Sequence, residues 1–318
     1  MLQQIIDWLV YSVFGLSPEA RLAGVVNFFL YDSVKILLLL FVMIGVIGFV
    51  RSYISQHKIK DFIHKKGVFG NIFASFFGSI TPFCSCSSIP IFLSFLEAGI
   101  PLGVTFSFLI TSPLINEYLV IVMLGFFGWR ITLLYVLSGI VIGVISGLVL
   151  GRMNLGHHLV KGLISQDAQL PKEIPHRTLK NRVLFGVNEA KAITKRLWVW
   201  ILVGVGIGAF IHNYIPQETI QAIISKAGPL SVPIATILGV PMYGSCGAIV
   251  PIAVVLFRKG VPLGTALAFM MATAALSFPE AVILRRAMKL QLIAIFFGVT
   301  TLAIVITGYL FNLLQSIL

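Results

Sequence analysis

The chain has 318 residues, of which 58% are hydrophobic and 11% are charged. A soluble globular chain carries about a quarter charged residues, so this composition excludes a soluble domain and predicts a polytopic membrane protein. The net charge of +12 does not indicate a nucleic-acid partner, because the basic residues lie in loops between apolar runs, where the positive-inside rule accounts for them.

Apolar runs long enough for a transmembrane helix recur along the chain. A helix needs about 20 residues to cross a hydrocarbon core of about 30 Å. Runs near this length lie at 31–50, 102–127, 131–151, 197–215, 262–284 and 291–313. They predict an all-α, multi-pass fold in the lipid bilayer.

Residues 1–30 precede the first of these runs. The segment lacks a basic n-region and a small-residue cleavage site, and Asp7 interrupts its apolar stretch, so it does not read as a cleaved signal peptide. We expect an interfacial helix there, with a short crossing as the alternative. We expect Asp32 and Lys35 to lie at one end of the following span, where such side chains reach the interface.

The segment from Gly67 to Ala98 is too long for one crossing. Its 32 residues would form a helix of about 48 Å, against a hydrocarbon core of about 30 Å. Pro82 and Pro90 flank Cys84-Ser-Cys-Ser-Ser, whose side chains disfavour a helix interior. We therefore predict a re-entrant hairpin with two helical arms; one long tilted crossing helix is the alternative.

A shift of 161 residues superposes the two halves of the chain. The matching residues are Val50–Ile54 with Ile211–Ile215, Lys65 with Lys226, Gly67 with Gly228, Pro90 with Pro251, and Gly99–Gly103 with Gly260–Gly264. The repeat covers about 35–150 and 197–313, and it places Cys246 at the position of Ser85. The segment 230–257, rich in proline and glycine, is therefore predicted to be a second hairpin.

The repeat divides the chain into four parts. These are an N-terminal interfacial segment at 1–30, a first membrane repeat at 31–151, a basic cytoplasmic linker at 152–196 and a second membrane repeat at 197–318. The linker is polar and holds nine Lys or Arg residues. Its end, from Asn188 to Arg196, has good helix formers, which predict that the next span begins within it.

The distribution of basic residues favours an inverted arrangement of the two repeats. If both hairpins return to the face that they enter, the loops of one face hold 17 of the 23 Lys and Arg residues and those of the other face hold five. If both segments crossed fully, the division would be about even, against the positive-inside rule. Each repeat then has three crossing helices plus a re-entrant or broken helical hairpin, and the odd number of crossings inverts the second repeat.

The three cysteines lie in the two hairpins. Cys84 and Cys86 could share a ligand only in an unwound stretch, because residues two apart point in opposite directions on a helix. Thiolates are soft ligands, and Cys246 would complete a three-sulfur site for a metalloid. Alternatively, the cysteines pack as small apolar side chains. Ser85 and Ser245, beside the cysteines, are further candidates for substrate contact.

Two acidic residues follow the hairpins in corresponding places. Glu117 and Glu280 lie within or near the end of an apolar run, and a carboxylate in hydrocarbon is costly enough to indicate proton coupling or substrate contact. For Glu280 an interfacial role near Arg285 is the alternative. Asn116 and Ser277 are equivalent at the 161-residue offset and could hydrogen-bond to substrate at the same depth.

Several of these residues resemble a known family. Pro82-Phe-Cys-Ser-Cys86 followed by Pro90, the Gly-x-Pro-Leu-Gly element after it, and the return of this layout in the second half resemble the predicted permease family that includes the organoarsenical efflux permeases. The resemblance implies a plasma-membrane permease, with Cys84 and Cys86 at the positions of the cysteines that handle trivalent organoarsenic. Ser87 and the spacing from Tyr243 to Cys246 depart from the family pattern, which leaves the substrate open.

These observations together predict an integral membrane permease for secondary active efflux. The hairpin tips, 82–90 and 241–251, would meet near the midplane and bind a metalloid or organoarsenical, with proton coupling at Glu117 and Glu280. The alternatives are a permease for a sulfur compound or organic anion, and a thiol-based redox component. No motif for an enzyme, a resident metal or a cofactor appears, and the number of subunits stays open.

Overall fold

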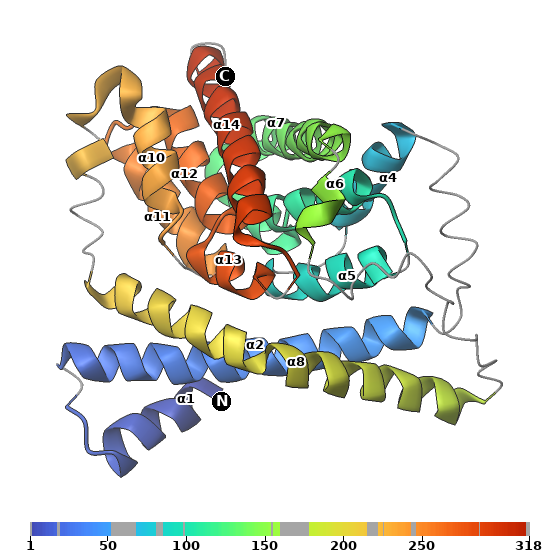
Figure 1. The fold of residues 1–318 in the computed structure, drawn as a ribbon. Coiled ribbons are helices and arrows are strands. Elements are labelled where there is room, and N and C mark those ends of the chain that lie inside the picture. Colours follow the sequence, from blue (N-terminus) through green and yellow to red (C-terminus); the bar gives the residue numbers. More distant parts are fainter. Residues whose placement is uncertain are drawn as a thin grey trace.

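The computed structural model describes residues 2–17, 20–51, 68–80, 85–97, 99–153, 155–159, 178–214, 222–224, 226–242, 246–285 and 287–315. The regular structure of this part of the chain is helical, apart from an isolated bridge between Leu159 and Met288. Figure 1 shows a layer formed by α2 and α8, with most of the other helices packed on one side of it.

The described part of the chain is a succession of helices. In chain order they are α1 (Leu2–Asp7), the π-helix η1 (Trp8–Val13), α2 (Arg21–Arg51), α4 (Val68–Ile80), α5 (Ser85–Glu97), α6 (Leu102–Leu114), α7 (Glu117–Arg152), the 3₁₀ helix η2 (Leu155–His158), α8 (Leu179–Tyr214), the 3₁₀ helix η3 (Gly228–Leu230), α10 (Ser231–Gly239), α11 (Cys246–Arg258), α12 (Leu263–Ala275), α13 (Phe278–Leu284) and α14 (Leu290–Leu314).

Within the described residues, four stretches are long and apolar enough to cross a membrane. They are Leu22–Val46, Leu119–Arg152, Leu263–Leu284 and Leu290–Leu314. The prediction of a helical, polytopic membrane protein is thus confirmed. The prediction that Asn188–Arg196 continues as a helix into the following apolar run also holds, because α8 runs without interruption from Leu179 to Tyr214.

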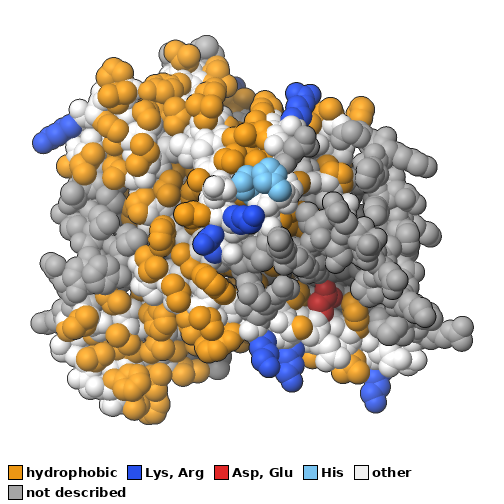
Figure 2. Space-filling view, in the orientation of Figure 1, with side chains coloured by type: hydrophobic (Ala, Val, Ile, Leu, Met, Phe, Trp, Pro, Cys, Tyr) orange, Lys and Arg blue, Asp and Glu red, His pale blue; other side chains and the backbone are white. Residues whose placement is uncertain are grey.

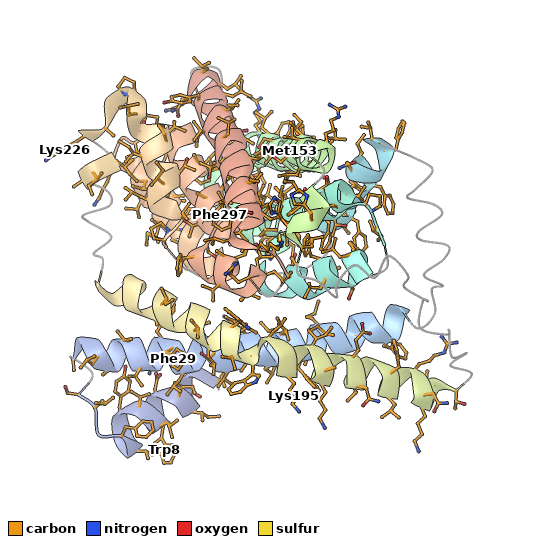
Figure 3. All side chains as sticks on the ribbon, in the orientation of Figure 1. Trp8, Phe29, Met153, Lys195, Lys226 and Phe297 are labelled. Carbon is orange, nitrogen blue, oxygen red and sulfur yellow. The ribbon has the colours of Figure 1, made fainter. Side chains whose placement is uncertain are left out.

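Glycines let α2 and α8 pack closely against each other. A Cβ atom at Gly48 would lie 2.9 Å from the Cα atom of Gly186, so neither position has room for a side chain without a shift. Towards the other end of the pair, Phe29 lies against Gly206 (Figure 3). The two helices are therefore antiparallel and closely packed along much of their length.

The helices α6 and α12 form the centre of the molecule. Every residue from Gly103 to Asn116 is buried, as is every residue from Leu263 to Ser277. Both helices stop inside an apolar run that the sequence suggested was continuous. Pro113, in the last turn of α6, cannot donate to the Leu109 carbonyl oxygen and so weakens the end of this helix, and a proline in the first turn of α13 marks a new helix start. We call residues 115–116 the first break and residues 276–277 the second break.

Elements of the two halves have matching bounds at the 161-residue offset. The helix α5 corresponds to α11 and α6 to α12, residue for residue, and Gly128 inside α7 has non-helical angles at the position where α13 and α14 are separate. Local hydrogen bonds recur as well. The Ile115 N–H group donates to Thr111 at 2.9 Å, and the Leu276 N–H group donates to Ala272 at 2.9 Å.

Asp32 differs from the expectation that it sits at a span end. The helix α2 begins at Arg21, ten residues before the apolar run suggested, so Asp32 lies well inside the span Leu22–Val46. It is only 6% exposed and shares the buried face of α2 with Ile36, Leu40 and Ile44, one helical turn apart. The interfacial interpretation of Asp32 is therefore wrong.

Candidate functional site

Each half contains a helix pair followed by a broken helix. Where a single long helix could have run from 68 to 97, α4 and α5 have 13 residues each and flank residues 81–84. In the second half, α10 and α11 flank residues 240–245. We call these the α4–α5 connection and the α10–α11 connection.

The last turns of α4 and α10 pack against the central helix of the same half. Near the end of α4, a Cβ atom at Gly78 would lie 3.1 Å from the Phe108 carbonyl oxygen, about two turns before the first break. Gly239, equivalent to Gly78, likewise lies against Phe269 and Thr273 of α12. The absence of a side chain at these glycines lets the helix pairs approach the central helices closely.

Hydrogen bonds also join each helix pair to the region of the break in its half. The Phe278 N–H group, directly after the second break, donates to the carbonyl oxygen of Val240 at 3.0 Å. In the first half, the hydroxyl groups of Ser88 in α5 and Ser112 in α6 are 2.7 Å apart and buried. Each half therefore brings a cysteine-bearing helix pair next to an interruption of its central helix.

Contacts also run between the halves. The helix α5 packs against α13, and α11 packs against α7. Phe127 of α7 and Phe257 of α11 have ring centroids 5.8 Å apart. The second arm of each pair thus contacts the helix that follows the break of the other half.

The predicted cysteine and serine positions are only partly within the described residues. Cys84 and Ser245 lie outside them. Ser85 and Cys86 occupy the first two positions of α5, and Cys246 is the first residue of α11; only their backbone is described. These residues thus lie at helix N-termini, where backbone N–H groups favour a negatively charged ligand.

The breaks carry the predicted polar residues. Asn116 is 8% exposed in the first break and Ser277 is 3% exposed in the second. Glu280 lies in the first turn of α13 and is only 2% exposed. Glu117 is the first residue of α7, two residues from the position equivalent to Glu280, and it is exposed. The interfacial alternative for Glu280 is therefore not supported by its burial.

Tyr135 supports the first break and was not singled out from the sequence. Its hydroxyl group donates to the Leu114 carbonyl oxygen at 2.9 Å, and its side chain is completely buried. This carbonyl, at the end of α6, has no partner within its own helix, so the tyrosine replaces a missing helical hydrogen bond. In the sequence, the one sign of this role was a tyrosine within an apolar run.

We expect Tyr135→Phe to lower the thermal midpoint of the purified protein measurably. The substitution leaves a buried carbonyl without its hydroxyl donor, which costs about 1–3 kcal/mol. Tyr309→Phe is the matched control, because the Tyr309 hydroxyl also donates to a carbonyl, that of Pro229 at 2.8 Å, but at an exposed position. Equal midpoints for the two variants in the same detergent would contradict a supporting role for Tyr135.

Comparison with known proteins identifies the family. A family model described as "Predicted permease" matches residues 21–313. A protein of Streptococcus mutans, whose name describes a subunit of a two-component membrane permease complex, is 24% identical over 201 residues, which are 61% of this chain and 65% of its own. UPF0718 protein YcgR of Bacillus subtilis is 25% identical over 207 residues, which are 61% and 66% of the two chains.

A more extensive match is UPF0718 protein MJ0584 of Methanocaldococcus jannaschii, with 22% identity over 288 residues, 73% of this chain and 79% of the relative. The chain spans less than two thirds of the length of the first two relatives. No solved structure matches it. Since the family model covers most of the sequence, this multi-pass helical membrane protein belongs to the predicted permease family, as its residues indicated.

Proposed function

We propose that the chain is a secondary permease of the cell membrane, and not an enzyme, whose substrate binds where the two connections meet the two breaks. The observation that carries this proposal is the recurrence of one layout in both halves: a helix pair against the interruption of a central buried helix. Interrupted helices at the interface of two repeats are the usual sites of secondary transporters.

The two repeats are proposed to be inverted, with three crossings and one re-entrant pair each. Helices α4, α5 and α11 have 13 residues and α10 has nine, so no arm of a pair reaches the roughly 20 residues that a crossing needs. The sequence-based charge asymmetry supports the same topology, with the linker 152–196 on the cytoplasmic side.

The proposed substrate is a small soft species, a metalloid or an organoarsenical. Cys86 and Cys246 begin helices that start directly after the connections. The positive end of a helix stabilises an anion, and the thiolate is the form of cysteine that binds soft metalloids. Cys84 would supply the third sulfur. Ser85, Ser245, Asn116 and Ser277 would contact the remaining polar groups of the substrate.

Replacement of all three cysteines by serine tests the substrate class. We expect Cys84→Ser/Cys86→Ser/Cys246→Ser to lose most of the flux of a trivalent organoarsenical into everted membrane vesicles, because serine is a hard oxygen ligand that binds arsenic(III) poorly. Met153→Leu is the control: it removes an exposed sulfur atom that lies beyond the end of α7.

Unchanged organoarsenical flux in the triple variant would exclude a thiol site. If the wild-type protein instead carries an organic anion, and the triple variant does so equally well, the substrate is held by backbone N–H groups, as in the alternative proposal. Reduction or oxidation of an added thiol reagent without any flux would favour a redox component.

A further inference from the structure

The segment after α7 is anchored to the connection between α13 and α14. Leu159 forms a bridge with Met288, and the Lys289 N–H group donates to the His158 carbonyl oxygen at 2.9 Å. The Lys289 ammonium group donates to the His157 carbonyl oxygen at 3.1 Å. Leu159 is 5% exposed and Met288 is fully buried, so this contact has an apolar base. We call it the junction.

The junction gathers positive charge. The rings of His157 and His158 have centroids 3.9 Å apart, and Lys289 lies beside them. Arg285 is exposed four residues before Lys289. Among the described residues 150–159 and 281–292 there is no Asp or Glu. Figure 2 shows the histidine side chains with Lys or Arg side chains next to them on one face.

The electrostatic surroundings of His158 favour a neighbouring anion. The Nδ1 atom of His158 is buried and has no hydrogen-bond partner in the described part of the chain. Desolvation lowers the pKa of His158, and the positive charges of His157 and Lys289 lower it further. A bound anion would reverse this effect, because it stabilises the imidazolium form and offsets the repulsion between neighbouring cations.

Lipid-facing surface adjoins the junction. Leu290, the first residue of α14, is 64% exposed. Met153 and Val149, at the end of α7, are 46% and 41% exposed. Both helices belong to candidate membrane spans and contact each other. A phosphate at the junction would therefore have acyl-chain surface beside it.

We propose that His157, His158, Arg285 and Lys289 bind the phosphate group of an anionic phospholipid. Basic groups between membrane helices on one side of the bilayer are suited to such head groups. The lipid would lie against both halves of the chain, because His157 and His158 follow α7 whereas Arg285 and Lys289 precede α14. A free phosphate ion has the same head-group chemistry but gains nothing from the apolar surface.

The test measures lipid binding by the purified full-length protein. Native mass spectrometry or a fluorescent-lipid titration compares phosphatidylglycerol with phosphatidylcholine in the same detergent. We expect the wild type to prefer phosphatidylglycerol and the preference to weaken with added NaCl. Each basic residue near the surface contributes about fivefold, so Arg285→Gln/Lys289→Gln is expected to lose about thirtyfold in affinity.

The matched control is Lys191→Gln/Lys195→Gln. These exposed lysines of α8 have the same four-residue spacing, and Lys195 points away from the bundle (Figure 3). The control is expected to retain the wild-type preference. Unchanged affinity in Arg285→Gln/Lys289→Gln, or an equal loss in the control, would overturn the site at the junction.

Two further arms separate the sources of phosphate and the role of the histidines. If millimolar inorganic phosphate displaces phosphatidylglycerol completely, the lipid assignment is overturned. If acidification from about pH 7.5 to about pH 6 tightens lipid binding in the wild type but not in His157→Gln/His158→Gln, protonation of imidazole groups at the junction contributes as proposed. If the lipid affinity of the wild type does not change with pH, the histidines are not part of the site.

Discussion

Glu280→Gln is expected to abolish most of the pH dependence of transport. Glu280 is 2% exposed in the first turn of α13, directly after the second break, and α13 packs against the cysteine-bearing helix α5. A carboxyl group in such surroundings binds and releases a proton as its environment changes, whereas an amide of the same shape cannot. We expect proton-driven flux of a trivalent organoarsenical in proteoliposomes to fall by at least about tenfold, an effect of about 1.4 kcal/mol.

Glu117→Gln is the matched control for this prediction. The two glutamates follow equivalent breaks, but Glu117 is exposed. Its replacement by glutamine is therefore expected to reduce transport less. We expect a smaller change in its flux and a pH profile close to that of the wild type. A wild-type pH profile in Glu280→Gln, with the larger effect in Glu117→Gln, would assign the proton site to the first half. Thermal midpoints measured in parallel separate lost coupling from lost folding.

Gly264→Ala is expected to destabilise the protein by about 1–3 kcal/mol through overpacking. An added Cβ atom would overlap the carbonyl oxygen of Gly308 and lie 2.7 Å from the backbone nitrogen of Asn312. The Leu263 N–H group, next to it, donates to the side chain of Gln315 at 2.8 Å. Separation of α12 from α14 would therefore also lengthen a hydrogen bond that caps the central helix.

Gly298→Ala should have the opposite effect. Gly298 lies in α14 with no heavy atom within 4 Å of an added Cβ atom. Alanine there gains about 0.5–1 kcal/mol of helix propensity with no steric cost. The two thermal midpoints, measured in one detergent, should therefore shift in opposite directions. A rise in both would show that α12 and α14 can separate without loss.

Residue spacing and length were sufficient to predict much of the architecture. The length of 67–98 excluded a single crossing, and α4 and α5 are indeed two helices. The motif around Cys84 and Cys86 indicated the family that the comparison confirms. These inferences work because membrane thickness and helix rise are fixed quantities, and because prolines restrict the backbone wherever they occur.

The breaks and the buried acids were harder to locate. A proline lies close to each break, Pro113 before the first and one in the first turn of α13 after the second. However, apolar residues on both sides of each break make the segment look like one continuous apolar run. The burial of Asp32 could not be predicted because hydropathy alone places the start of α2 ten residues later than the residue at which the helix begins. Glu117 and Glu280 are two residues apart in the register of the repeat, and which of them is buried depends on the packing of α7 and α13.

The junction between His158 and Lys289 also constrains how the halves can move. The segment after α7 and the segment before α14 are joined there by two hydrogen bonds from Lys289 and by the buried contact between Leu159 and Met288. Sliding of one half past the other would break all of these interactions together, whereas a rotation about this point preserves them. We therefore expect that, if the proposed permease alternates the exposure of its site, the two halves rotate about the junction, with displacements that grow with distance from it.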